Sequence, residues 1–169
     1  MEKRSVETII GALNAANVRY LVAGGLAVVA HGYVRFTADV DLILDFDPGN
    51  VTRAMEALAG LRYRPRAPVG LDEFADPAKR ALWVREKGLT VFSLYSAEHP
   101  LTEVDLFVEA PLNFEQAYRT ARRMEVAPSV SATFVGLADL IHLKKKAGRA
   151  QDLLDIDTLK ALQEKKDRE

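Results

Sequence analysis

The sequence predicts an α+β fold that combines the strands of a sheet with helices. Residues 38–46 and 102–108 alternate between polar and apolar side chains, which is the period of a strand with one buried face. Residues 5–16 instead place apolar side chains three and four positions apart, the period of an amphipathic helix. Residues 137–163 are predicted to form a C-terminal helical segment, so helices precede, separate and follow the strands.

Length and composition limit the classes of protein to which the chain can belong. Its 169 residues are near the usual size of one domain, so we expect a single domain over residues 1–169. The formal net charge of -1 argues against a broadly basic nucleic-acid coat, although it is compatible with a local basic groove. No cysteine is present, which excludes disulfides, thiolate metal sites and cysteine nucleophiles.

No segment has the pattern of an export signal or a membrane span. The N-terminal residues mix charged side chains into their apolar positions and contain no apolar h-region. No later segment approaches the apolar length needed to cross a bilayer. We therefore expect a cytoplasmic protein with no membrane partner.

Turn-forming residues divide the first part of the chain into alternating helices and strands. Gly24 and Gly25 mark a tight turn after a short apolar strand. Residues 47–50 form the next turn, in which Pro48 also suits the first turn of a helix. The expected elements are a helix at 5–16, a strand at 18–23, a helix at 26–31, a strand at 38–46 and a helix at 50–59.

The rest of the chain has weaker local signals. Prolines make residues 62–66 an edge strand followed by a loop, and Asp76 with Pro77 caps and starts a helix. Leu82 and Trp83 are expected to face inward from this helix. The other expected elements are strands at 89–95 and 102–108, a helix at 113–120, extended segments at 124–127 and 132–135, and the C-terminal helical segment with a break at residue 148.

Paired acidic residues in the strand patterns suggest a metal site. Asp39 and Asp41 lie on the same strand face, and burying an unpaired carboxylate costs on the order of several kcal/mol. A divalent cation would supply the missing positive charge. Glu103 and Asp105 repeat this arrangement in the strand at 102–108. If the two strands are neighbours, three carboxylates converge in a site suited to Mg²⁺, and we select Asp105 over Glu103 as the third.

The glycine pair suits a phosphate group. Gly24 and Gly25 precede a helix, and backbone N–H groups at a helix N-terminus favour anions. Taken alone, a short glycine motif is more often only a tight turn. With the carboxylates it fits a nucleoside triphosphate (NTP) and two Mg²⁺ ions, one activating an attacking hydroxyl and the other stabilising the leaving pyrophosphate. Asp105 would orient the ion on the nucleophile side or accept the proton.

These residues also carry a resemblance to a known family. The nucleotidyltransferase superfamily related to DNA polymerase beta has a signature that this chain resembles at Gly24, Gly25, Arg35, Thr37, Asp39 and Asp41. Within that superfamily the chain looks most like the small bacterial nucleotidyltransferase-like proteins that include the abortive-infection toxin group. Their C-terminal helical motif is matched at Lys144, Gly148, Arg149, Asp152 and Asp155. The resemblance covers residues 19–44 and 137–159, with one further match at residues 103–105.

The resemblance implies a nucleotidyltransferase fold, in which a mixed central sheet is flanked by helices, and a role for each matched position. The implied metal ligands and catalytic residues are Asp39, Asp41 and Asp105. The implied nucleotide-binding residues are Gly24, Gly25, Arg35, Lys144, Arg149 and Asp152, with Lys144 reaching the phosphates. The chain departs from the pattern at Leu26, because many members have Ser directly after the second Gly or in its place, where the hydroxyl contacts phosphate.

Several of these residues have a structural alternative. Arg35 would bind phosphate or, as we favour, pair with a carboxylate such as Asp39 and orient it. Lys144 lies in a charge run that is usual for a solvated helix face. Arg149 and Asp152 would form only a surface pair three residues apart on a helix. The histidines show no ligand pattern, so no zinc site is assigned.

The leading hypothesis is a Mg²⁺-dependent nucleotidyltransferase that moves a nucleoside monophosphate from NTP to a hydroxyl acceptor and releases pyrophosphate. The acceptor is a small molecule such as an antibiotic, a protein side chain, or RNA, including tRNA. The alternative is a catalytically weak or inactive nucleotide-binding module that works with a partner protein as a toxin or antitoxin. The intact acidic residues favour the enzyme, whereas Leu26 favours the binding module.

Overall fold

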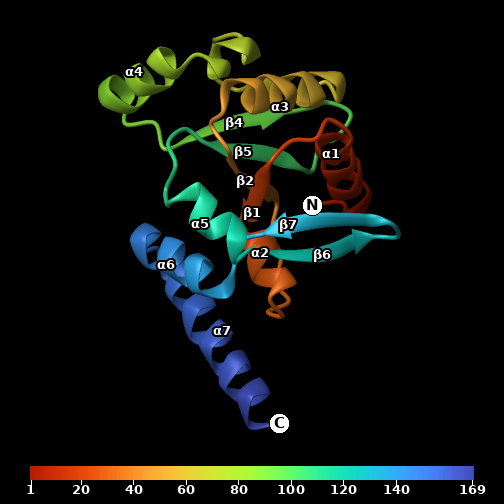
Figure 1. Ribbon diagram of the computed structural model, residues 1–169, viewed down its shortest axis with the longest axis vertical. Helices are drawn as coiled ribbons and strands as arrows, with labels where there is room; N and C mark the ends of the chain where they lie inside the picture. Colours follow the sequence, from red (N-terminus) through yellow and green to blue (C-terminus); the bar gives the residue numbers. More distant parts are fainter.

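A seven-stranded mixed sheet forms the centre of the protein, shown by a computed structural model that describes residues 1–169 (Figure 1). Its strands, in chain order, are β1 (Tyr20–Ala23), β2 (Asp39–Leu44), β3 (Arg64–Pro65), β4 (Val91–Tyr95), β5 (Glu103–Phe107), β6 (Arg122–Ala127) and β7 (Val130–Phe134). Their order across the sheet is β3-β4-β5-β2-β1-β7-β6. The short β3 lies at one edge, as Pro65 and the nearby Pro68 predict.

Helices flank the sheet, which confirms the predicted α+β class. They are α1 (Lys3–Ala15), α2 (Gly24–Ala30), α3 (Pro48–Gly60), the 3₁₀ helix η1 (Leu71–Ala75), α4 (Pro77–Lys87), α5 (Phe114–Arg119), α6 (Leu137–Ala147) and α7 (Ala150–Arg168). The first helix contacts α3, β6 and β7, whereas α6 contacts α2 and α7. The last helix runs away from the sheet to the C terminus (Figure 1). No helix is both long and apolar enough to cross a membrane.

The two acidic strands are neighbours, as the metal-site hypothesis requires. β2 and β5 pair in parallel, with Asp41 opposite Asp105 and Asp39 opposite Glu103. The flanking pairs, β1 with β2 and β4 with β5, are antiparallel. A parallel register of this kind places the carboxylates of both strands on one face of the sheet.

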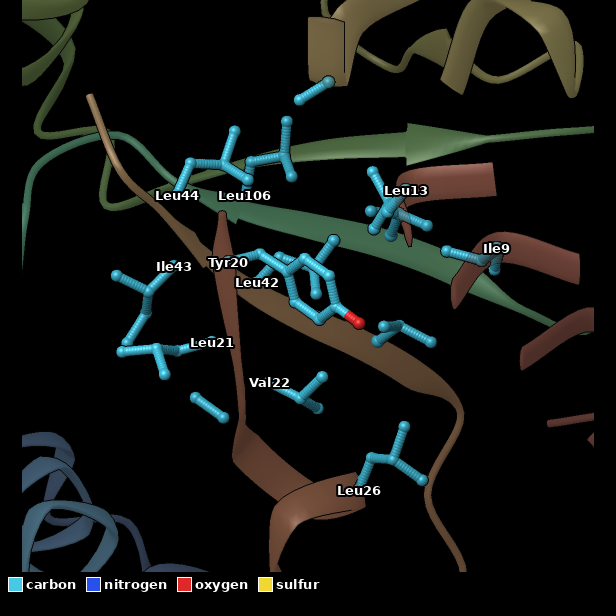
Figure 2. Packing of buried hydrophobic residues seen from close by; sticks show 14 of the residues in the cluster. Ile9, Leu13, Tyr20, Leu21, Val22, Leu26, Leu42, Ile43, Leu44 and Leu106 are labelled. Carbon is cyan, nitrogen blue, oxygen red and sulfur yellow. The ribbon is translucent and has the colours of Figure 1, made fainter. Parts of the chain in front are cut away.

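The opposite face of these strands belongs to the hydrophobic core. Leu42 and Leu106 are fully buried, and they lie toward Ile9 and Leu13 of α1 (Figure 2). Burying a side chain of this size contributes about 1.5–3 kcal/mol to folding. One cluster of 34 buried residues joins the sheet to its helices. The core therefore holds the backbone of β2 and β5 in place while their acidic side chains face away from it.

The helix cap predicted at Asp76 is present and a further cap forms at Asp47, but one inward-facing side chain was assigned wrongly. Asp47 accepts a hydrogen bond from the backbone N–H of Asn50 (3.1 Å), so α3 begins at Pro48 rather than two residues later. Asp76 caps α4 in the same way, accepting from Ala78 N–H (2.8 Å). In α4, Trp83 is buried, whereas the adjacent Leu82 is 38% exposed. Consecutive helical residues point about 100° apart, so only one of these two faces the sheet.

The C-terminal helical segment breaks where the sequence predicts. Gly148 adopts φ 65°, a left-handed conformation that glycine tolerates best, and it separates α6 from α7. The second helix continues to Arg168, beyond the predicted end at residue 163. The break turns the start of α7 back toward α6, which brings Asp152 next to Lys144.

Candidate functional site

A cavity of about 980 Å³ lies over the acidic face of β2 and β5. Its lining includes every residue predicted to form the site: Gly24, Gly25, Arg35, Asp39, Asp41, Asp105, Lys144, Arg149 and Asp152. These residues come from α2, the loop before β2, β2 itself, β5, α6 and the region where α7 begins. The structure thus brings together segments that lie more than a hundred residues apart in the chain, while their individual roles stay predictions.

The acidic residues of the cavity carry more negative charge than their surroundings compensate. Burial, followed by the charges of Asp105 and Asp39, raises the pKa of Asp41 to about 6. Burial and the charges of Asp105 and Glu103 also raise the pKa of Asp39. The Oδ1 atom of Asp105 is buried and has no hydrogen-bond partner. An unpartnered buried oxygen beside carboxylates with raised pKa values fits a cation-binding role.

These carboxylates do not form a finished metal cage. No group of three or more Asp, Glu, His or Cys side chains is arranged to hold a metal ion by itself. The donor set of Asp39, Asp41 and Asp105 nevertheless suits Mg²⁺, which prefers carboxylate oxygens and usually completes its coordination with phosphate oxygens and water. The residues present therefore fit an ion that arrives together with a phosphate ligand.

Glu103 differs from Asp105 in having a cationic partner. Arg66 donates from Nε to Glu103 Oε2 (3.1 Å) and from Nη2 to Oε1. The hydrogen bond from Arg66 lowers the pKa of Glu103 despite partial burial. Glu103 is also not part of the cavity lining. Of the two residues, only Asp105 lines the cavity with an unpartnered oxygen, while its role as the third carboxylate stays a prediction.

The glycine pair is the first turn of α2 rather than a separate turn before it. Gly24 has φ 61°, and a Cβ atom at this position would lie 1.9 Å from Asp41 Oδ2. A Cβ atom on Gly25 would lie 2.4 Å from Thr37 Oγ1. The two glycines thus make room for side chains from β2 and its preceding loop. Leu26 belongs to the core and not to the cavity lining, so the side chain at this position points away from the site.

The close approach of Gly24 to Asp41 gives a direct prediction. Gly24→Ala is expected to lower the free energy of unfolding by more than the roughly 1–2 kcal/mol that a left-handed alanine costs, because the new methyl group must displace the Asp41 carboxylate. Gly88→Ala is the matched control, since Gly88 has φ +59° and open space around it. Denaturant titration of both variants tests the prediction, and equal losses would contradict it.

A buried ion cluster joins α6 and α7 to the loop before β2. The Lys144 ammonium lies 2.9 Å from Asp152 Oδ1 and 2.8 Å from Asp155 Oδ2, and all three side chains are at most 5% exposed. Arg35 donates from Nε and Nη2 to the two oxygens of Asp155, each at 2.7 Å. The expected pairing of Arg35 with a carboxylate is therefore confirmed, but the bidentate partner is Asp155, 120 residues away in sequence, and not Asp39.

Asp152 links this cluster to an exposed cation. Arg149 donates from Nε to Asp152 Oδ2 (2.7 Å), while its own side chain is 76% exposed. Burial raises the pKa of Asp152, but the hydrogen bonds from Arg149 and Lys144 together outweigh burial, so the pKa falls to about 2. The alternative of a surface pair thus describes Arg149 but not Asp152.

Sequence reasoning placed Asp155 in the resemblance motif without giving it a role. The structure makes it the most connected carboxylate of the cluster, bound by Arg35, Lys144 and Gln151. Its spacing of three residues from Asp152 on a helix was a signal that both carboxylates share a face.

Comparison with known proteins does not assign the chain to a family. No protein-family model matches the chain, and no curated protein is significantly similar to it. The resemblance to nucleotidyltransferases stays a prediction that rests on the residues named above.

Proposed function

We propose that the protein is a Mg²⁺-dependent nucleotidyltransferase with a nucleotidyltransferase fold, which moves a nucleoside monophosphate from NTP to a hydroxyl acceptor. One observation carries the proposal. Asp41 and Asp105 lie side by side on neighbouring parallel strands, close to Asp39. All three line a cavity whose lining also includes Lys146 and Arg149. Uncompensated carboxylates next to cations suit a ligand that brings both metal ions and phosphates.

Each carboxylate has a role in this reaction. Asp39 and Asp41 would hold the Mg²⁺ ions, two in the complete site, with Asp105 as the third ligand. Bound Mg²⁺ would neutralise phosphate charge and favour attack at the α-phosphorus. The acceptor oxygen forms a bond to the α-phosphorus, the bond to the bridging oxygen breaks, and pyrophosphate leaves with the electron pair. The unpartnered Oδ1 of Asp105 suits it to accept the hydroxyl proton.

The cavity has room for more than the nucleotide. Ligand sites usually occupy about 300–1,000 Å³, and this cavity, at about 980 Å³, is near the upper end of that range. Part of an acceptor would therefore fit beside the NTP. The acceptor classes that we propose to test are RNA, including tRNA, protein side chains, and small hydroxyl compounds such as antibiotics.

Transfer of label tests the proposal. The protein is incubated with Mg²⁺ and each NTP labelled at the α-phosphate, together with total RNA, tRNA, the protein itself or a panel of small hydroxyl compounds. We expect label on one acceptor class, and loss of this label in Asp105→Asn. Glu103→Gln is the matched control, because Glu103 precedes Asp105 by two residues on the same strand but pairs with Arg66 outside the cavity.

The alternative function, a nucleotide-binding module that engages a toxin or antitoxin partner, has one observation in its favour. Val34 and Phe36, in the loop before β2, are 84% and 81% exposed. Large exposed apolar side chains two positions apart in one loop are typical of contact surfaces. Binding of Mg²⁺ and NTP with no label transfer to any acceptor would favour this second function.

The raised pKa of Asp41 predicts the pH dependence of metal binding. A proton on Asp41 competes with Mg²⁺, and since the pKa of Asp41 is about 6, the affinity is expected to fall as pH drops below that value. Proton competition at one such group weakens binding about 10-fold between pH 7 and pH 5. Titration with Mg²⁺ alone is the measurement, because NTP phosphates also titrate near pH 6. Equal affinity at pH 7 and pH 5 would contradict the assignment.

A further inference from the structure

We propose that Arg149 and Lys146 hold the triphosphate, and that Lys144 positions Arg149 through Asp152 without binding phosphate itself. This inference rests on the proposed function and identifies the part of the cavity that receives the phosphates. It reassigns the role that the resemblance gives to Lys144 and adds Lys146 to the site.

The surroundings of Lys144 leave its ammonium little capacity for a substrate anion. Its side chain is 5% exposed, and Nζ lies within 2.9 Å of carboxylate oxygens from both Asp152 and Asp155. Those carboxylates are themselves 1% and 0% exposed. Movement of Lys144 toward a phosphate would leave both buried carboxylates with one cation fewer, which proteins strongly disfavour.

Arg149 has the opposite environment. Its Nε donates to Asp152, its Nη2 reaches Asp152 only at 3.4 Å, and its side chain is 76% exposed in the cavity lining. One edge of the guanidinium is therefore fixed by a buried carboxylate, while Nη1 makes no hydrogen bond. A planar guanidinium that is held at one edge is pre-oriented to donate to phosphate oxygens from the other.

The buried ion cluster carries an excess positive charge, and its exposed member is Arg149. Three cations, Lys144, Arg35 and Arg149, share the two carboxylates of Asp152 and Asp155. The cluster therefore has one positive charge in excess, and Arg149 is its most exposed member. Asp41 is close enough for its charge to raise the pKa of Arg149, after the larger effects of Asp152. Phosphates bound by Arg149 would therefore lie in the same cavity as the proposed metal ligands.

Lys146 supplies a second cation on the same side of the cavity. It lies in the last turn of α6 and contributes to the lining, with no carboxylate partner. Its neighbour Lys145 is also exposed but does not line the cavity. The chain thus offers two adjacent lysines on one helix turn, of which only one faces the proposed ligand.

Calorimetric titration with Mg²⁺-pyrophosphate and Mg²⁺-ATP tests this assignment. Pyrophosphate reports on the phosphate contacts without a base or sugar. We expect Lys146→Ala and Arg149→Gln each to weaken binding of both ligands about 10-fold or more, the loss typical of a charge-assisted hydrogen bond. Lys145→Ala should bind like the wild type. The glutamine in Arg149→Gln keeps an N–H donor for Asp152, so the buried cluster retains a partner.

A double-mutant cycle tests the positioning role of Lys144. If Lys144 acts through Arg149, Lys144→Gln weakens pyrophosphate binding in the wild-type background but not in the Arg149→Gln background. Direct contact with phosphate predicts the same additional loss in both backgrounds, which would overturn the assignment. All titrations are done at a temperature where circular dichroism shows every variant to be folded.

The failure of this inference differs from the failure of the proposed function. If the wild type binds both ligands and Lys146→Ala and Arg149→Gln bind as well as Lys145→Ala, the phosphate assignment is wrong and the proposed function stands. If the wild type binds neither ligand, the proposed function is overturned together with the assignment.

Discussion

Replacing Asp41 with Asn is expected to abolish nucleotidyl transfer while making the metal-free protein more stable. The folded state raises the pKa of Asp41 to about 6 from its ordinary 3.8, so folding favours the protonated form. The associated stability is fully present below about pH 4 and is lost as pH rises through 6. At pH 7 the ionised carboxylate costs up to about 3 kcal/mol, and the isosteric amide removes this cost.

The same variant, although more stable, should lose activity. Removal of a metal ligand is expected to reduce transfer by more than the roughly 10–100-fold typical of losing an outer partner of a ligand. Denaturant titration without metal and the label-transfer assay measure the two effects on one sample. A variant that is both inactive and less stable would indicate that Asp41 supports the fold, and would contradict its assignment as a metal ligand.

Replacing Asp155 with Asn is expected to give the largest loss of stability. Asp155 is fully buried and accepts hydrogen bonds from Arg35 and Gln151 while it pairs with Lys144. Removing one partner from a buried ion pair costs about 3–5 kcal/mol, because the remaining charge stays buried without compensation. The rise in melting temperature on adding Mg²⁺ and ATP should become smaller too, since Arg35 anchors the loop that leads to Asp39.

Two comparisons make this second prediction specific. Asp157→Asn is the matched control, since Asp157 is exposed on the same helix and should change stability by no more than about 0.5 kcal/mol. The deficit of Asp155→Asn should also shrink in acid. Burial raises the pKa of Asp155, but the hydrogen bonds from Arg35, Lys144 and Gln151 together outweigh burial and hold the pKa below its ordinary 3.8. The contribution of Asp155 is therefore present above that pH and is lost as pH falls further. A deficit that is constant from pH 6 to pH 2.5 would contradict the ion-pair explanation.

Local patterns were sufficient to predict the parts of the fold that depend on one segment at a time. The alternation around Asp41 and Asp105 predicted two half-buried strands, and β2 and β5 confirm both. The break at Gly148 was readable because glycine is the residue that best tolerates a left-handed conformation. These features depend on backbone preference and on side-chain period, both of which the sequence displays directly.

Contacts between distant segments were not predictable in the same way. Arg35 had several nearby acidic residues as plausible partners, and only the packing of α7 shows that Asp155 is the one it binds. The charge run at residues 144–146 predicted a solvated helix face, which describes the exposed Lys145 and Lys146 but not Lys144, which is buried against Asp152 and Asp155 of α7. Similarly, the reason for Gly24 is the Asp41 carboxylate across the strand pair, a contact that no local pattern displays.

The most direct test of the proposed site is thermal melting with and without Mg²⁺ and ATP. A ligand at 100 times its dissociation constant stabilises the folded state by about 2.7 kcal/mol, which for a domain of this size corresponds to roughly 5–10 °C. We expect the wild type to show such a shift and Asp39→Asn with Asp41→Asn to show none relative to its own metal-free melting temperature. An equal shift in this double variant would contradict the metal site.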